Sequence, residues 1–216
     1  MTDTQFSTAD IIQMEQPFRA NFITSLSGFK SICLVGTTDP KGRTNLGLYS
    51  QVFHVGANPP LIGILVRPDT VVRDTLNNII KTGHFTLNHV RPEFYQAAHH
   101  ASAHHTQSEF ELCGFTPQFS DLHPAPYVQE ASIKLGLKLV QRTYIKLNGT
   151  ILVIGEIVEA LVPEECLQED GYVDLEKAQS MTVSGLDSYH VTHRLNRLPT
   201  PEADSSFIVS TESMLS

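Results

Sequence analysis

The spacing of apolar positions along the chain predicts a protein built mainly of β-strands. Short apolar runs occupy Ser31–Thr38 and Pro60–Arg67, and apolar and polar residues alternate along Gly83–His89. Runs of about four to eight such residues, bounded by turn-forming residues, are typical of strands. Because Pro60–Arg67 is apolar almost throughout, we expect it to form a central strand that is buried on both faces.

Two strand pairs are indicated by their turns. Asp39–Gly42 places proline second and glycine fourth, which suits a tight turn and predicts a hairpin between the first apolar run and Asn45–His54. A longer hairpin is expected between Leu135–Leu147 and Ile151–Val162, joined through the dipeptide Asn-Gly at 148–149. Asn-Gly is typical of a type I′ turn, in which both central residues have positive φ.

Helical patterns are fewer and shorter. Thr70–Lys81 has apolar residues at helical spacing, and Pro92–Ser102 begins with proline at an expected first helical position. Single turns of helix are expected at Glu164–Gln168 and Asp174–Ser180. Many strands with a few short helices fit a β-barrel with helical decoration, and they do not fit an alternating parallel sheet.

We expect one domain over residues 17–198. The chain has 216 residues, which is close to the size of a single domain, and no internal repeat is visible. The first 16 residues are weakly patterned, and residues 199–216 combine two prolines with many Ser, Thr and acidic positions. A weakly ordered segment over 1–16 and a tail or arm over 199–216 are therefore expected.

Composition and charge exclude several classes of protein. With 41% hydrophobic and 18% charged residues, the chain can bury a core and is not mainly disordered. A formal net charge of -8 argues against nucleic acid or an anionic membrane as a partner, because both need concentrated positive charge. No apolar run reaches the roughly 20 residues of a membrane span, and the N-terminus lacks a signal-peptide pattern. The three cysteines lack metal-ligand or redox spacing, so we expect a reducing, cytoplasmic compartment.

Common catalytic and nucleotide motifs are missing, and one segment offers a phosphate site instead. The sequence has no G-x-G-x-x-G after a strand, no P-loop, no G-x-S-x-G and no H-E-x-x-H. At residues 67–75 an expected strand ends and an expected helix begins, with Arg67, Thr70, Arg73 and Thr75 nearby. Free N–H groups at a helix start, two guanidinium groups and two hydroxyls could hold a dianionic phosphate. A capped helix with surface arginines is the alternative.

Two further segments combine polar and glycine residues where strands are expected. Thr44–Gln51 places Gly47 within a strand, and such a glycine often marks a close approach by a ligand or only a bulge at a barrel corner. Gly185–Arg194 brings a tyrosine, two histidines and an arginine together, as in the wall of a site or in a polar closing strand.

A cluster of histidines at 99–105 permits a different function. On a helix, His100 and His104 would be i, i+4 neighbours, and two imidazoles on one face could hold a metal ion in a hydrolase. No cysteine or carboxylate stands at a fitting local spacing to complete such a site, so we expect no bound metal.

The order of several motifs resembles the flavin reductase-like family, whose members have the FMN-binding split-barrel fold. The resemblance covers about residues 18–198 and rests on T-N-L-G-x-x-S, N-P-P-L, R-x-x-T-x-x-R-D-T, T-G-x-F-T-L-N and G-L-D-S-Y-H-x-T-x-R. It implies a mainly β fold, a split β-barrel of the Greek-key, FMN-binding type with a few short helices.

The resemblance also implies a homodimer that holds FMN in a cleft between protomers. It assigns to the flavin ring and ribityl chain the residues Thr44, Asn45, Leu48, Tyr49, Ser50 and Gln51. It assigns to the phosphate Arg67, Thr70, Arg73, Asp74 and Thr75, although Pro68 restricts the backbone of Arg67. Asn88 would border the same cleft, and Tyr189, His190 and Arg194 would approach the flavin.

The activity implied is hydride transfer from NADH or NADPH to flavin, with the protein supplying position and electrostatics. His190 is the expected catalytic residue, which would stabilise negative charge on the reduced flavin. The alternative is a non-catalytic FMN-binding protein or an electron carrier, with the same phosphate site but without turnover.

Overall fold

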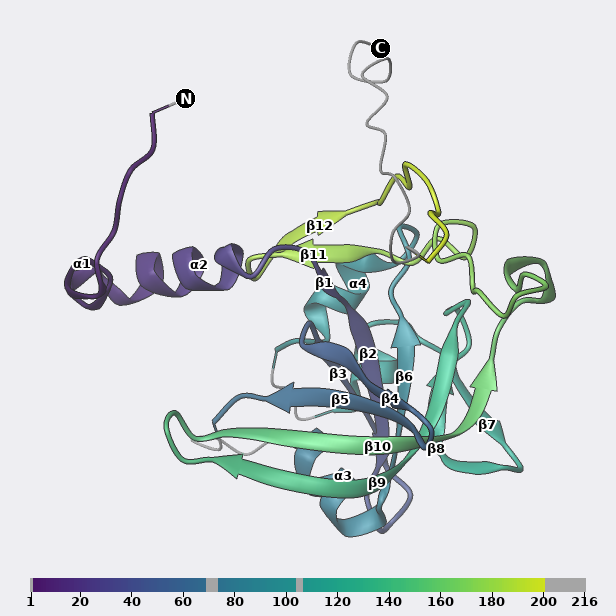
Figure 1. Ribbon diagram of the computed structural model, residues 1–216. Helices are drawn as coiled ribbons and strands as arrows, with labels where there is room; N and C mark the ends of the chain where they lie inside the picture. The colour runs from purple at the N-terminus through teal and green to yellow at the C-terminus, as the bar shows by residue number, and fades with distance from the viewer. Residues whose placement is uncertain (1, 69–73, 104–106, 201–216) are drawn as a thin grey trace.

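A seven-stranded antiparallel sheet forms the body of the protein in the computed structural model, which describes residues 2–68, 74–103 and 107–200. Its strands run in the order β3-β2-β6-β9-β10-β5-β4. Their bounds are β2 Cys33–Thr38, β3 Thr44–Tyr49, β4 Val52–Ala57, β5 Pro60–Val66, β6 His84–His89, β9 Lys134–Ile145 and β10 Thr150–Leu161. The sheet is strongly curled: β9, β10 and β5 cross the lower part of Figure 1, while β2 and β6 run upward.

Smaller elements surround this sheet. A three-stranded sheet contains β1 (Lys30–Ser31), β11 (Thr182–Ser184) and β12 (Ser188–His190), and a two-stranded sheet pairs β7 (Pro117–Ser120) with β8 (His123–Val128). The helices are α1 Thr8–Gln13, α2 Gln16–Leu26, α3 Asp74–Thr82, α4 Tyr95–His100 and α5 Glu109–Leu112, with a 3₁₀ turn at Glu164–Cys166. In the described part of the chain, no helix is long and apolar enough to cross a membrane.

β2 is buried on both faces, as is the middle of its neighbour β6. The residues of β2 alternate between two core clusters, with Leu34 in the first and Cys33 and Val35 in the second. The expectation of a buried central strand at Pro60–Arg67 is confirmed only in part: β5 is paired on both sides, with β10 and the edge strand β4, and Gly63, Ile64 and Val66 are buried, but its other residues are exposed or half-buried. Both segments are apolar, and only the pairing of strands decides which one becomes central.

The expected single strand at Asn45–His54 is two strands. It breaks at Ser50 and Gln51, because β3 pairs with β2 whereas β4 pairs with β5. These two consecutive strands form opposite edges of the seven-stranded sheet. The curl of the sheet must therefore bring its two edges close enough for a two-residue connection to span them, and the barrel stays open along this line.

The long hairpin is confirmed in its strands but not in its turn. β9 pairs with β10 from Thr150 opposite Ile145 to Leu161 opposite Lys134. Of the turn residues only Gly149 has positive φ, at 76°, and its N–H donates to Ile145 O at 2.9 Å. A type I′ turn needs positive φ at both central residues, so this four-residue loop belongs to another class.

The helical expectations are confirmed in part. α4 lies within Pro92–Ser102 and the 3₁₀ turn within Glu164–Gln168, whereas α3 overlaps the expected Thr70–Lys81 over residues 74–81 and extends one residue past it. Residues 174–180 form turns without a helix.

The first 16 residues contain α1, whose N-cap Ser7 and third helical residue Asp10 form a reciprocal capping box. α1 and α2 project from the body as an arm, as Figure 1 shows. We use the name N-terminal arm for residues 6–29. Residues 199 and 200 are exposed coil, and the rest of the expected tail lies outside the described residues.

Candidate functional site

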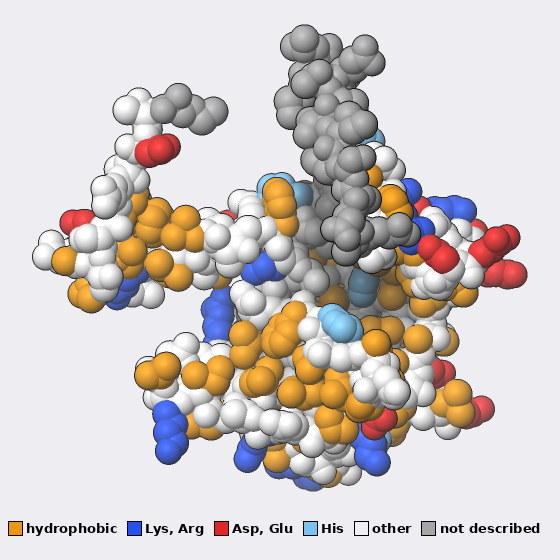
Figure 2. Space-filling model, in the orientation of Figure 1, with side chains coloured by type: hydrophobic (Ala, Val, Ile, Leu, Met, Phe, Trp, Pro, Cys, Tyr) orange, Lys and Arg blue, Asp and Glu red, His pale blue; other side chains and the backbone are white. Residues whose placement is uncertain are grey.

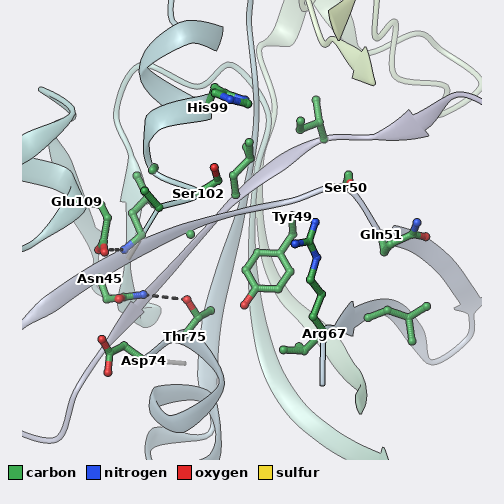
Figure 3. A pocket seen from close by; sticks show the side chains of 18 of the residues that line it. Asn45, Tyr49, Ser50, Gln51, Arg67, Asp74, Thr75, His99, Ser102 and Glu109 are labelled. Carbon is green, nitrogen blue, oxygen red and sulfur yellow. Dashed lines mark hydrogen bonds between the residues drawn. The ribbon is translucent and has the colours of Figure 1, made fainter. Parts of the chain in front are cut away.

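A cavity of about 390 Å³ lies where the barrel is open (Figure 3). One wall is β3 with the connection to β4, and the end of β5 and the start of α3 provide others. Of the residues assigned to a ligand from the sequence, the structure brings eight to this cavity: Asn45, Leu48, Tyr49, Ser50, Gln51, Arg67, Asp74 and Thr75. They come from segments that are separated in sequence, and they lie close together because the sheet curls until its two edges approach each other.

The polar residues of β3 are held in place by hydrogen bonds to α3 and β2. Asn45 Nδ2 donates to Thr75 Oγ1 at 2.9 Å and to Thr37 Oγ1 at 3.3 Å. Gly47 permits this close approach, because a Cβ there would lie 2.9 Å from Thr75 Oγ1. The glycine in this strand is therefore needed for contact between β3 and α3 at the cavity, and it is not at a bulge, since the β2–β3 register is continuous.

The residues suited to a phosphate lie at one end of the cavity. Arg67 lines it despite the following proline, and Figure 3 shows its side chain beside the ring of Tyr49. Thr75, which is 7% exposed, and Asp74 lie in the first described turn of α3. The Asp74 carboxylate would repel a phosphate, whereas the hydroxyl and guanidinium would attract it. Thr70 and Arg73 lie outside the described residues.

Five of the assigned residues lie away from this cavity, and Thr44 and Asn88 are the two in the first half of the chain. Thr44 lines a neighbouring cavity of about 500 Å³, and its hydroxyl is 3.0 Å from Ser108 Oγ. Asn88 is fully buried within the fold, where Nδ2 donates to Leu34 O and Oδ1 accepts from Val128 N. Because both ends of its amide serve the fold, Asn88 has a structural role in this chain.

The late segment is placed differently from the expectation. Tyr189, His190 and Arg194 are not among the residues of the described chain that line the cavity. His190 Nε2 is 2.8 Å from Ser184 Oγ, and its ring packs edge-on against Phe29 with centroids 4.9 Å apart. Arg194 pairs with Asp174 at 3.2 Å. The geometry within one protomer therefore does not support a role for His190 or Arg194 beside the ligand.

Sequence reasoning missed several lining residues. His99 and Ser102 come from the end of α4 and the loop after it, Glu109 from α5, and Leu186 from the turn between β11 and β12. Glu109 is 6% exposed and accepts the N–H of Leu46 at 3.2 Å, which ties α5 to β3. The histidine cluster was a signal for His99, but its spacing pointed to metal chemistry rather than to a cavity wall.

The metal reading gains no support from the structure. Among residues 2–68, 74–103 and 107–200, no group of three or more His, Cys, Asp or Glu side chains is arranged to hold a metal ion. His104, the expected partner of His100, lies outside the described residues. His99 instead contacts Tyr189, with Nδ1 2.7 Å from the hydroxyl oxygen.

Comparison with known proteins agrees with the fold. Residues 26–179 match the family described as flavin reductase like domain. A split-barrel protein from Shewanella frigidimarina, assigned as a flavin reductase, is 44% identical with a TM-score of 0.89, covering 92% of this chain and 100% of that one. The 2-nitrobenzoate 2-nitroreductase NbaA of Pseudomonas fluorescens is 26% identical with a TM-score of 0.79, covering 94% and 100%. Flavoredoxin of Desulfovibrio vulgaris is 25% identical with a TM-score of 0.70, covering 80% and 92%.

These similarities confirm the expected mainly β, split-barrel architecture with a few short helices, in which the open sheet edges are the split. The chain belongs to the flavin reductase-like family.

Proposed function

We propose that the protein binds FMN in the cavity at the open edge of the barrel and transfers hydride from NADH or NADPH to flavin. The observation that carries this proposal is the convergence of β3, Arg67 and the first turn of α3 on one cavity. It is further supported by membership of the flavin reductase-like family and by the likeness to an assigned flavin reductase at 44% identity.

The residues present fit FMN. Arg67 and the Thr75 hydroxyl, together with Thr70 and Arg73, would hold the phosphate, since a guanidinium binds phosphate in a bidentate manner. The segment from Asn45 to Gln51 would lie along the ribityl chain and the ring, where backbone groups at the end of β3 can read a heterocycle edge. The lack of a side chain at Gly47 keeps this wall close to α3.

The chemistry divides between the cofactor and the chain. FMN, when bound, supplies a ring that accepts a hydride. The chain fixes the ligand and leaves one side of the cavity open, so that a nicotinamide can approach to within about 3–3.5 Å of the accepting atom. Hydride transfer between the two rings does not require a side chain to act as a general base.

We propose that the protein is a homodimer. The N-terminal arm supports this proposal, because it exposes large apolar side chains that Figure 2 shows gathered on a projecting segment: Phe6 43%, Ile12 65%, Phe18 59%, Ile23 45%, Leu26 67% and Phe29 71% exposed. No residue of α1 or α2 is buried. A short helix is marginally stable in water unless it packs against another surface. A second protomer would provide that surface and would bury these apolar side chains.

A reducing, cytoplasmic compartment remains part of the proposal. The three cysteines are free thiols, and burial raises the pKa of Cys33 to about 12, so that this thiol is unreactive at neutral pH.

The decisive experiment is a visible absorption spectrum of purified protein after incubation with FMN, followed by NADH and NADPH oxidation with free flavin or oxygen as acceptor. A flavin spectrum at one FMN per chain and steady turnover support the proposal. A protein that takes up no FMN would contradict it.

The phosphate end is tested by Arg67→Ala, with exposed Arg142 on β9 changed to Ala as the matched control. The loss of a charged hydrogen bond should weaken FMN by about 10- to 100-fold. Riboflavin, which lacks the phosphate, should bind with nearly unchanged affinity. Equal weakening of both ligands would place the phosphate elsewhere.

An electron carrier is the second candidate, and the likeness to flavoredoxin at 25% identity favours it. It shares the FMN site and differs in turnover. Tight stoichiometric FMN without oxidation of either nicotinamide would select the carrier.

A further inference from the structure

One histidine of the 99–105 cluster stands at the mouth of the cavity. His99 lies in the last turn of α4, lines the cavity and is exposed. In Figure 3 it is on the opposite side of β3 from Asp74 and Thr75, the residues suited to a phosphate. A ligand whose phosphate is held at that end would direct its ring toward β3. His99 would then be available to contact a second ligand that binds beside the ring.

Tyr189 fixes the orientation of the His99 ring. Its hydroxyl oxygen is 2.7 Å from His99 Nδ1, and the two rings meet edge to face at 79° with centroids 5.7 Å apart. Tyr95 also packs against Tyr189, with the two ring centroids 5.3 Å apart. The imidazole is therefore held by a side chain from β12 that itself packs against α4.

The contact between Tyr189 and His99 Nδ1 leaves the other ring nitrogen, Nε2, to contact a ligand. Burial, with a smaller contribution from Asp187, raises the pKa of Tyr189 to about 12, so its hydroxyl keeps its proton at neutral pH. No other acceptor for this hydroxyl is found in residues 2–68, 74–103 and 107–200. Where Tyr189 donates to Nδ1, the second nitrogen of the imidazole, Nε2, carries the N–H that can be offered to a ligand.

The surroundings suit a flat group with one hydrogen-bond acceptor. The lining residues that follow α4 are Ala101, Ser102 and Ala103, which all have small side chains. No Lys or Arg of the described residues lines this cavity except Arg67. The described residues therefore offer no further positive charge to a second phosphate group. A neutral carbonyl group needs only one N–H donor, which a histidine can supply.

We propose that His99 Nε2 donates a hydrogen bond to the carboxamide oxygen of the nicotinamide that delivers the hydride, and that Tyr189 is the positioning residue that presents this donor. The inference rests on the proposed function, since it concerns the second ligand of the same cavity. His99 acts in binding and orientation, and the hydride itself passes directly between the two rings.

The test compares FMN-loaded wild type with His99→Ala, His99→Gln and Tyr189→Phe, and with His54→Gln as a matched control on exposed β4. Two quantities are measured: the Kd of NAD⁺, a non-reducing probe, by calorimetry, and KM and kcat for the preferred reduced nicotinamide. The Kd of FMN is measured for every variant by fluorescence.

Loss of one neutral hydrogen bond should raise the Kd of NAD⁺ and KM by about three- to tenfold in His99→Ala. We expect partial recovery in His99→Gln, which keeps an N–H donor, and a two- to threefold rise, roughly, in Tyr189→Phe. Tyr189→Phe added to His99→Ala should have no further effect, because the positioned group is gone. The Kd of FMN and the behaviour of His54→Gln should match wild type.

Two outcomes overturn the inference while the proposed function stands. Unchanged Kd and KM for the nicotinamide in His99→Ala would show that the imidazole does not contact it. Weakened FMN with unchanged nicotinamide binding would place His99 on the flavin instead. A wild-type protein that binds no FMN would overturn both the proposed function and this inference.

Discussion

Strand β3 and the β9–β10 hairpin belong to one sheet, yet they use their residues in different ways. β10 buries alternate residues from Ile151 to Gly155, as a strand with one face on a core does. β3 buries only Leu46 and leaves its other five residues half-buried along the cavity or beside it. Since a strand with one buried residue adds little to the core, the stability of the barrel comes mainly from the hairpin and its neighbours, and β3 is free to serve a ligand.

The two regions also use glycine differently. A Cβ at Gly155 in β10 would lie 2.7 Å from the ring of Phe85, inside the core. A Cβ at Gly47 in β3 would meet Thr75 Oγ1 and the Tyr49 ring at the cavity. The same residue type thus makes room for packing in the first case and for a binding wall in the second, and substitutions can separate the two.

The largest effect is expected from Phe85→Ala. Phe85 is fully buried in the cluster that joins β6, β9 and β10, so its truncation should lower the free energy of unfolding by about 3–5 kcal/mol. Urea unfolding measures this loss. Tyr144→Ala, at a hairpin position 60% exposed, is the control and should change stability by less than about 0.5 kcal/mol. A loss below about 1 kcal/mol for Phe85→Ala would refute the assignment of stability to the hairpin side.

A pH-dependent loss of stability is expected from His89 at the end of β6. Burial lowers the pKa of its imidazole to about 4, and Nδ1 lies 2.9 Å from Ser180 Oγ. In the unfolded chain the ordinary value of about 6.5 returns, so between pH 6.5 and 4 the unfolded state binds more protons. The contribution is present in full above about pH 6.5 and is lost as the pH falls toward 4, by up to about 3 kcal/mol.

Chemical unfolding of wild type and His89→Gln at several pH values isolates the contribution of His89 to the free energy of unfolding, because all other titratable groups are common to both proteins. The stability difference between the two proteins should shrink as the pH falls from 7 to 4. A difference that stays constant across this range would show that His89 does not couple folding to pH.

Gly155→Ala should reduce the free energy of unfolding by about 1–3 kcal/mol, because the new methyl group overpacks the core against Phe85. FMN affinity of the folded protein should stay within about twofold of wild type. Thermal unfolding and a fluorescence titration give the two values. Weaker FMN with unchanged stability would reverse the contrast between the two glycines.

Gly47→Ala should show the opposite profile, with the smallest effect on folding. The methyl group displaces the hydroxyl of Thr75, which Asn45 holds at 2.9 Å, and so disturbs the cavity wall. On the proposed function, FMN should bind about tenfold more weakly, equivalent to about 1.4 kcal/mol, while the free energy of unfolding changes by less than about 1 kcal/mol. The same titration and unfolding measurements decide, and an unchanged FMN Kd would remove Gly47 from the binding wall.

Much of the strand content could be predicted from the sequence, since alternation and turn residues act locally. The Asp39–Gly42 turn is present, with Gly42 N–H donating to Asp39 O at 2.9 Å, and the paired strands of the long hairpin lie where the pattern puts them. The family motifs also indicated the polar part of β3. These features depend on neighbours within a few residues, which the chain carries wherever it folds.

Local pattern misjudged the elements whose identity depends on distant partners. The apolar run at β5 resembles a central strand and lies beside an edge, and the segment at Asn45–His54 resembles one strand and divides between two edges. α1 and α2 were missed because their apolar residues do not form the periodic stripe of a packed surface helix.

The sequence by itself determined that this chain forms a mainly β domain with a polar, glycine-bearing strand and a basic junction beside a helix. The tertiary structure alone decided that these parts meet in one cavity, that Asn88 and His190 lie outside it, and that His99 and Glu109 belong to it. The reason is physical: side-chain periodicity fixes which face of a strand is buried, whereas the curl of a seven-stranded sheet fixes which remote segments touch.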